Sequence, residues 1–87
     1  MFVTVVYDLE TTGLNTLDDR VIQFGAIVLN EENTELLRFS SYVDPGERQI
    51  HPSASEVTGI SHKTLTGAPS FTVMWNSLLA NLDSSLL

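Results

Sequence analysis

Two segments of this sequence carry apolar side chains on both faces of an extended chain, and this pattern constrains the fold more than any other feature. They are residues 2–9 and 20–29, and both are rich in β-branched and aromatic residues. In the first, Val5 and Tyr7 share one face while Val6 lies on the other. Strands of this kind occur in sheets that other elements cover on both sides. The pattern therefore predicts a sheet within a layered α/β fold.

A third extended segment completes a hairpin with the second. Residues 34–43 have the composition of a strand, and the polar turn at 30–33 separates them from residues 20–29. Within residues 20–29, strict alternation predicts that Val21 lies on the face opposite Phe24. We therefore expect three antiparallel strands that neighbour one another in the order of the sequence.

Helical signals are confined to the second half of the chain. Residues 53–57 predict one helical turn, and residues 61–66 predict another, which Ser61 caps. A longer amphipathic helix follows Ser70, which is placed to cap it, because apolar residues recur there at helical spacing. These residues are Phe71, Met74, Trp75, Leu78, Leu79 and Leu82.

One such helix covers one face of a three-stranded sheet but not both. We therefore expect residues 1–87 to be the N-terminal part of a single domain, incomplete by itself. The final residues, 86–87, have the composition of the start of a further strand.

Composition narrows the classes of function. The 87 residues include 11 acidic and 4 basic side chains, for a net charge of −7, so no basic stripe is available to bind nucleic acid. If the protein binds a polyanionic substrate, a metal ion must supply the positive charge. The chain has no cysteine, which excludes disulfides, thiol catalysis and Cys-ligated zinc. It has neither a leader-like segment nor a long apolar run, so we expect a soluble, cytoplasmic protein without a membrane partner.

Asp8 and Glu10 form the most informative pair of side chains. They are two residues apart on an expected strand, so both project from one face, with Cα atoms roughly 6 to 7 Å apart. Hard oxygen ligands at this spacing suit Mg²⁺ or Mn²⁺, and two such ions can promote phosphodiester cleavage. By itself the Asp-x-Glu pattern before Thr-Thr-Gly is more typical of an ordinary turn than of a metal site.

The residues around this pair resemble a known family. Residues 6–14, VYDLETTGL, resemble the first motif of the DEDD, or DnaQ-like, 3′–5′ exonucleases, and residues 20–27 resemble the strand that follows it. Residues 52–71 match the segment that leads into the family's first helix. The family includes the epsilon proofreading subunit of bacterial DNA polymerase III, RNase T-like enzymes and exonuclease domains fused to helicases. The resemblance covers essentially the whole chain and implies a ribonuclease H-like fold.

The resemblance also implies roles for matching residues. Asp8 and Glu10 correspond to the first two metal-binding carboxylates of a two-ion site for Mg²⁺ or Mn²⁺, and are therefore the expected catalytic positions. Residues 11–13 would present amide and hydroxyl groups to the terminal nucleotide, and Leu14 would pack against its base. The substrate-binding residues implied in this way are Leu9, Thr11, Thr12, Gly13, Leu14, Thr58 and Gly59.

Some of these residues have a structural alternative. Gly13 is also suited to a tight turn with a positive φ angle, and the Thr58-Gly59 pair is suited to end a helix without any ligand. The family often has a histidine at the Thr58 position, so the match is imperfect there.

The family also needs groups that this sequence lacks. It uses four carboxylates and a histidine base in a His-x-x-x-x-Asp arrangement, and only the first two carboxylates are present in residues 1–87. We therefore expect little or no activity from this chain alone. The expected partners are the 3′ end of single-stranded or frayed DNA or RNA, and a polymerase or helicase. Two alternatives are a non-catalytic binding module and a site that a partner chain completes.

The remaining polar and aromatic residues have simpler interpretations. His51 and His62 lie outside the family's base position, and we interpret both as non-catalytic. Asp18 and Asp19 are interpreted as solvated loop carboxylates, and Trp75 as a core anchor of the long helix.

Overall fold

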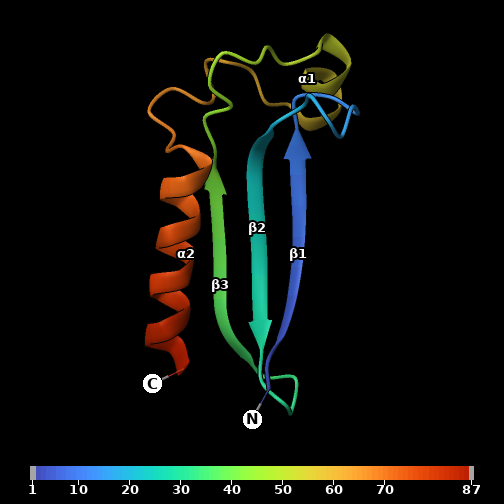
Figure 1. Cartoon of the computed structure of the whole chain (residues 1–87). Helices are drawn as coiled ribbons and strands as arrows, with labels where there is room; N and C mark the ends of the chain where they lie inside the picture. The colour runs from blue at the N-terminus through green and yellow to red at the C-terminus, as the bar shows by residue number, and fades with distance from the viewer. Residues whose placement is uncertain (1, 87) are drawn as a thin grey trace.

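The structure is a computed structural model that describes residues 2–86, so Met1 and Leu87 lie outside the described residues. This part of the chain forms three strands and two helices (Figure 1). They are β1 (Thr4–Thr11), β2 (Val21–Leu29), β3 (Glu35–Tyr42), α1 (Pro52–Thr58) and α2 (Phe71–Leu86). The strands form one antiparallel sheet in the order β1-β2-β3, which confirms the expected arrangement.

The observed β1 ends later than the sequence predicts. It runs to Thr11 rather than to Leu9, because the pairing of β1 with β2 continues past Glu10. Asp8 and Glu10 are therefore held inside a paired strand and not in the loop that follows it. Such a strand positions side chains more rigidly than a loop does.

Of two predictions about the second half, one is confirmed in part and the other is wrong. Residues 62–67 form consecutive turns and not a helix, but Ser61 caps them as predicted, because its hydroxyl oxygen accepts a 3.4 Å hydrogen bond from the Thr64 amide. At the C-terminal end α2 continues through Leu86, which is therefore helical and not the start of a strand. The other residue of that prediction, Leu87, lies outside the described residues.

A β-bulge near the start of β2 changes the face that Val21 occupies. The ladder between β1 and β2 passes from Gln23 to Val21 and leaves Ile22 as the extra residue. Val21 consequently packs with Phe24 against the core beneath α2, on the same face instead of the opposite one. Simple alternation was wrong here because a bulge shifts the side-chain period by one residue.

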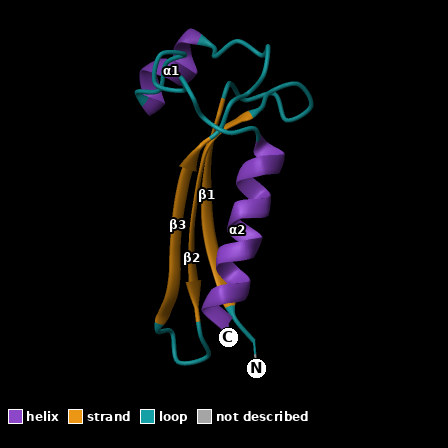
Figure 2. Cartoon of the chain, turned by 90° about the vertical axis from the view of Figure 1, so that its left-hand side faces the viewer, coloured by secondary structure: helices purple, strands orange, loops and turns teal. Residues whose placement is uncertain are grey.

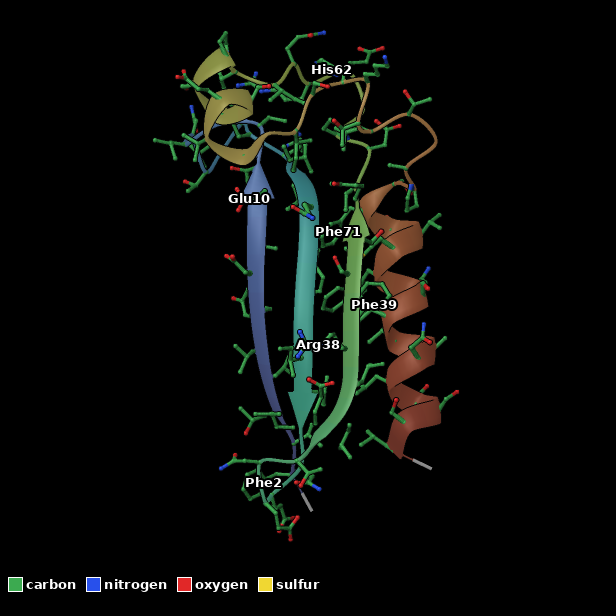
Figure 3. All side chains as sticks on the ribbon, turned by 180° about the vertical axis from the view of Figure 1, so that it is seen from behind. Phe2, Glu10, Arg38, Phe39, His62 and Phe71 are labelled. Carbon is green, nitrogen blue, oxygen red and sulfur yellow. The ribbon has the colours of Figure 1, made fainter. Side chains whose placement is uncertain are left out.

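The main core lies between the sheet and α2. Phe24 and Ala26 of β2 pack against Met74 and Leu78 of α2, and all four are buried. Figure 2 shows α2 on one side of the sheet, and Figure 3 shows Phe39 extending from β3 toward this helix. The predicted cap is confirmed, because the Ser70 hydroxyl oxygen accepts a 3.3 Å hydrogen bond from the amide of Val73. In residues 2–86, no helix has the length and apolar character needed to cross a membrane.

Much of the apolar surface of β1 remains exposed. Because α2 lies over β3, a groove of about 560 Å³ is left between α2 and β1. Trp75 borders this groove and is 41% exposed, although its ring lies edge-on to Phe24 at 6.2 Å, so it anchors the core only in part. The radius of gyration, 14.5 Å, exceeds the about 12 Å typical of a globular domain of this length. These observations agree with the expectation that one helix cannot cover the whole sheet.

A second, smaller core lies beyond the ends of the strands. The bulged Ile22 packs there with Ile60 and Leu65, and the half-buried Ile50 and Ala68 surround them. This cluster holds the segments on either side of α1 above the sheet (Figure 1). It does not include α1 itself, none of whose residues is buried.

We expect Met74→Ala to lower the free energy of unfolding by about 2 to 5 kcal/mol. The Met74 side chain is 1% exposed between α2 and the sheet, so its truncation leaves a cavity in the main core. Urea unfolding followed by circular dichroism measures the change. The control is Val73→Ala at a neighbouring exposed position of α2, where we expect a change within about 0.5 kcal/mol. Equal losses from both variants would contradict the assignment of the core.

Candidate metal and nucleotide site

Asp8 and Glu10 lie on the open face of β1, away from α2. They line one shallow hollow, whereas Tyr7, the residue before Asp8, lines the groove beneath α2. The other residues of this hollow are Leu9, Gln23, Gly25 and Ser40. Asp8 is directly opposite Gly25 in the ladder, so no large side chain stands across from it. Figure 3 shows Glu10 near the end of β1 that lies closest to α1.

The donor set of this hollow fits a hard divalent cation. Both carboxylates stand on one face, and within residues 2–86 neither of them pairs with a lysine, arginine or histidine. A cation between them would relieve the repulsion of the two negative charges. The described residues bring no third His, Cys, Asp or Glu into a group with them that could hold a metal. Two carboxylates by themselves are fewer ligands than such a cation requires.

A second hollow adjoins the first and gathers most of the expected substrate-binding residues. Its volume is about 280 Å³, and it lies between the end of β1 and one side of α1. Its lining residues are Leu9, Glu10, Thr11, Gly13, Leu14, Ser53, Ala54, Val57 and Thr58. Leu9 and Glu10 line both hollows, so the carboxylate pair and this second hollow, which we call the nucleotide pocket, are continuous.

Thr12 does not line the nucleotide pocket, and its interactions are structural. The residue is fully buried, and its hydroxyl donates to Asp19 Oδ1 at 2.7 Å and accepts from the Arg20 amide at 3.0 Å. Its own amide donates to the Arg20 carbonyl, and its carbonyl accepts from the His51 amide. These bonds engage every polar group of Thr12 within the protein.

Gly59 ends α1 and does not line the pocket either. Its φ of 73° is left-handed, and its amide donates to the Ser55 carbonyl at 2.9 Å, as in a glycine C-cap. The adjacent Thr58 lines the pocket, but its hydroxyl donates to the Ala54 carbonyl at 2.9 Å and accepts from the Ile60 amide at 3.1 Å. The alternative interpretation of Thr58-Gly59 as a helix end is thus the one that the backbone geometry favours.

Gly13 is required by close contact and not by a positive φ. Its φ is not in the left-handed region, which makes the turn interpretation wrong for this residue. A Cβ atom at Gly13 would instead overlap the His51 ring and the Asp19 carboxylate. The neighbouring Thr11 donates a 2.6 Å hydrogen bond to the Gly13 carbonyl, which further orders the end of β1.

Asp19 is the functional candidate that the sequence reasoning missed. Its side chain is only 3% exposed, which corrects its interpretation as a solvated loop carboxylate. Besides Thr12, its carboxylate accepts hydrogen bonds from the Asn15 amide at 2.9 Å and from Arg48 Nε at 3.2 Å. The hydrogen bond from Thr12 is the main reason that its pKa falls to about 2, and Asn15 and Arg48 lower it further against the opposing effect of burial.

No pattern in the sequence distinguishes Asp19 from Asp18, which is exposed. The two carboxylates differ only in what the fold brings near them. The residues near Asp19 in the sequence do not indicate that it pairs with Arg48, which lies 29 residues away.

The two histidines lie outside the hollow around Asp8 and Glu10. His51 immediately precedes α1, and its Nε2 lies 3.4 Å from Asp19 Oδ1, close enough for an ion pair when the ring is protonated. His62 is exposed in the turn region, and its Nε2 accepts a 3.4 Å hydrogen bond from the amide of Ile50. These positions agree with the interpretation of both residues as non-catalytic.

We expect Asp19 to stabilise the fold above about pH 4 and to lose that effect as the pH falls toward 2. Its folded pKa of about 2 lies below the ordinary value of 3.8, so the folded state favours the ionised form. The measurement is the urea unfolding free energy of wild type minus that of Asp19→Asn, from pH 6 to pH 2. The difference should be constant above about pH 4 and shrink below it. A difference independent of pH would show that the charge of Asp19 is immaterial.

We expect Gly13→Ala to destabilise the fold by about 1 to 3 kcal/mol, because the added methyl group must displace His51 or Asp19. Gly25→Ala is the matched control, since the nearest atom to its Cβ is the Phe39 carbonyl oxygen at an ordinary 4.0 Å. Alanine there should be neutral or slightly stabilising. Thermal unfolding of both variants measures the contrast, and similar effects would argue against the close contact at Gly13.

Relatives of known sequence are similar to this chain over most of its length. DNA polymerase III subunit epsilon of Buchnera aphidicola is 33% identical over 89 residues, which cover 97% of this chain and 37% of that protein. The PolC-type DNA polymerase III of Streptococcus pyogenes serotype M5 is 39% identical over 71 residues, or 80% of this chain and 5% of that protein. This chain thus spans only about a third or less of the length of these relatives.

Solved structures show the same fold. The nuclease domain of 3′hExo, a DEDDh family member bound to rAMP, matches with a TM-score of 0.81 at 21% identity, covering 98% of this chain and 46% of that one. Escherichia coli Exonuclease I in complex with a dT13 oligonucleotide matches with a TM-score of 0.71 at 25% identity, covering 79% of this chain and 15% of that one. The family model RNase_T, described as an exonuclease, matches residues 5–87. This match over nearly the whole chain identifies it as a member of the RNase_T exonuclease family.

Proposed function

We propose that this chain provides the first two metal-binding carboxylates and the terminal-nucleotide pocket of a metal-dependent 3′–5′ exonuclease domain. The observation that carries the proposal is the continuity of the two hollows, which share Leu9 and Glu10. In such an arrangement, a phosphate that follows a nucleotide seated in the pocket would be directed toward the two carboxylates.

Asp8 and Glu10 would hold Mg²⁺ or Mn²⁺, which activates water and stabilises the leaving oxygen in phosphodiester hydrolysis. The chain's own groups would bind and orient the substrate. Leu14, which is fully exposed at the rim of the nucleotide pocket, offers an apolar surface to a base. Thr11 and Gly13 would supply polar backbone groups beside the sugar. The hydrogen bonds of Thr12, which lies between them, would hold this stretch of backbone in place.

Electrostatics make nucleotide binding dependent on the metal. The lining of the two hollows contains no lysine or arginine among the described residues, and Arg48 is engaged with Asp19. At a net charge of −7, a phosphate group approaching Asp8 and Glu10 without a cation would be repelled. The bound metal is therefore the positive charge that the substrate requires.

The relatives favour nucleic acid as the substrate class, and we propose its 3′ end as the site of action and the cytoplasm as the location. They include polymerase III epsilon and PolC-type proteins, and the structural neighbours include complexes with rAMP and with a DNA oligonucleotide. A single-stranded or frayed 3′ end of DNA or RNA fits the nucleotide pocket, and a replicative polymerase fits as the partner for a proofreading role. Release of nucleoside 5′-monophosphates is the reaction that follows from the family.

A second candidate function is binding without hydrolysis. Its basis is that residues 2–86 bring only two carboxylates to the site and no histidine beside them. A chain with half a coordination shell and no general base should bind metal and nucleotide weakly and hydrolyse slowly or not at all. Activity in the full domain then depends on ligands supplied from outside these residues.

Paramagnetic broadening by Mn²⁺ tests the proposed metal site. We expect Mn²⁺, binding in about the millimolar range, to broaden the amide NMR signals of β1 around Asp8 and Glu10 first. Asp8→Asn should abolish this selective broadening, because it removes one carboxylate without a change in size. Asp83→Asn, at an exposed position on α2, is the matched control and should leave the broadening intact. Broadening that persists in Asp8→Asn would overturn the proposal.

A nuclease assay tests whether this chain hydrolyses nucleic acid by itself. With Mn²⁺ and a labelled single-stranded oligonucleotide, we expect no more than trace release of nucleoside monophosphate by this chain alone. Release that Asp8→Asn abolishes would show that residues 1–87 suffice for hydrolysis. That result would overturn the expectation that further ligands are needed.

A further inference from the structure

We infer that Asp19 is a positioning residue for the nucleotide pocket, because its buried carboxylate joins the loop after β1 to the segment that leads into α1. The use of the pocket by a nucleotide rests on the proposed function above. The geometry that Asp19 imposes on the pocket does not, and it is testable without a substrate.

The Asp19 carboxylate connects three separate stretches of the chain. Oδ1 accepts from the Thr12 hydroxyl at 2.7 Å and from Arg48 Nε at 3.2 Å, and it lies 3.4 Å from His51 Nε2. Oδ2 accepts from the Asn15 amide at 2.9 Å. Thr12 immediately follows β1, Asn15 lies in the exposed loop, and Arg48 and His51 precede α1. One carboxylate thus ties both sides of the pocket together.

The two walls of the nucleotide pocket belong to these same stretches. One wall consists of the end of β1 and the first loop residues, from Leu9 to Leu14. The other wall is the side of α1 formed by Ser53, Ala54, Val57 and Thr58. The walls are 39 or more residues apart in sequence, so local structure cannot set their separation.

Little else in the described residues fixes α1 against β1. No residue of α1 is buried, so a hydrophobic core does not hold the helix in place. The Ile22, Ile60 and Leu65 cluster anchors the chain after the helix, and before the helix it is reached only by the half-buried Ile50. The connections from the start of α1 to the loop after β1 are the backbone hydrogen bond from His51 to the Thr12 carbonyl, 2.8 Å long, and the contacts of Asp19.

Removal of the Asp19 carboxylate is expected to lower nucleotide affinity without unfolding the protein or lowering its metal affinity. Removal of the Asp19 carboxylate should let the walls separate while the sheet and α2 remain intact, because the main core shares none of its contacts. Asp8 and Glu10 should keep their metal affinity, since strand pairing holds them. Nucleotide affinity should fall, since both walls must contact the same ligand.

Electron paramagnetic resonance measures the separation of the walls directly. The chain has no cysteine, so spin labels on Thr16→Cys and Glu56→Cys report the distance between the loop and α1 without background. Both positions are exposed, and neither lines the pocket. We expect Asp19→Ala to lengthen and broaden the distance distribution. Glu35→Ala is the matched control, because it removes one carboxylate from an exposed 2.7 Å pair with Arg38.

Binding measurements then test the effect on the ligand. Thymidine 5′-monophosphate with Mn²⁺ is the probe, and we expect Asp19→Ala to weaken its binding about tenfold while affinity for Mn²⁺ alone changes less than about twofold. Asp19→Asn keeps the size and the acceptor for Thr12 and should recover part of the loss. A general loss of stability would move both affinities together, so this split distinguishes positioning from simple destabilisation.

The outcomes separate the two proposals. If wild type binds Mn²⁺ but no nucleotide, the proposed function fails, and the spin-label distances still decide whether Asp19 sets the wall separation. Unchanged distances in Asp19→Ala would overturn the inference, as would altered distances with unchanged nucleotide affinity. If Asp19→Ala does not fold, Arg48→Ala takes its place, because it breaks the 3.2 Å contact and leaves the Thr12 hydrogen bond.

Discussion

Burial of one face of β2 beneath α2 is the interaction on which the rest of the structure depends. Phe24 and Ala26 meet Met74 and Leu78 there, and this contact places the helix over β3. The strand β1 is held chiefly by its ladder to β2, with much of its own apolar surface exposed. The position of Asp8 on the open face is therefore set by backbone pairing to a strand that the core immobilises.

The region beyond the strand ends is stabilised in a different way. Its apolar cluster is small, and α1 contributes nothing buried to it. Polar contacts around Asp19 hold this region together in place of a large apolar core. Thr12 belongs to these contacts, since it is fully buried and every one of its polar groups is hydrogen-bonded. A site held by hydrogen bonds adjusts more easily than one held by a core, and such sites are suited to closing around a ligand.

Sequence reasoning succeeded where a local pattern is sufficient. The strand order, the amphipathic helix with its Ser70 cap, and the common face of Asp8 and Glu10 all follow from side-chain periodicity. It failed at Val21, where a bulge changes the period. It also failed at Asp19, because burial of that carboxylate requires Arg48 from a distant part of the chain.

By itself, the sequence determined the elements, their antiparallel order, the carboxylate pair and the family to which they belong. Those properties depend on residues within a few positions of one another or on ordered motifs. Only the tertiary structure decided that Gly13 is needed for close packing, that Thr12 is buried with its hydroxyl bonded to Asp19, and that Asp19 contacts both sides of the pocket. Each of these facts depends on which distant atoms come within contact distance, and side-chain periodicity carries no information about that.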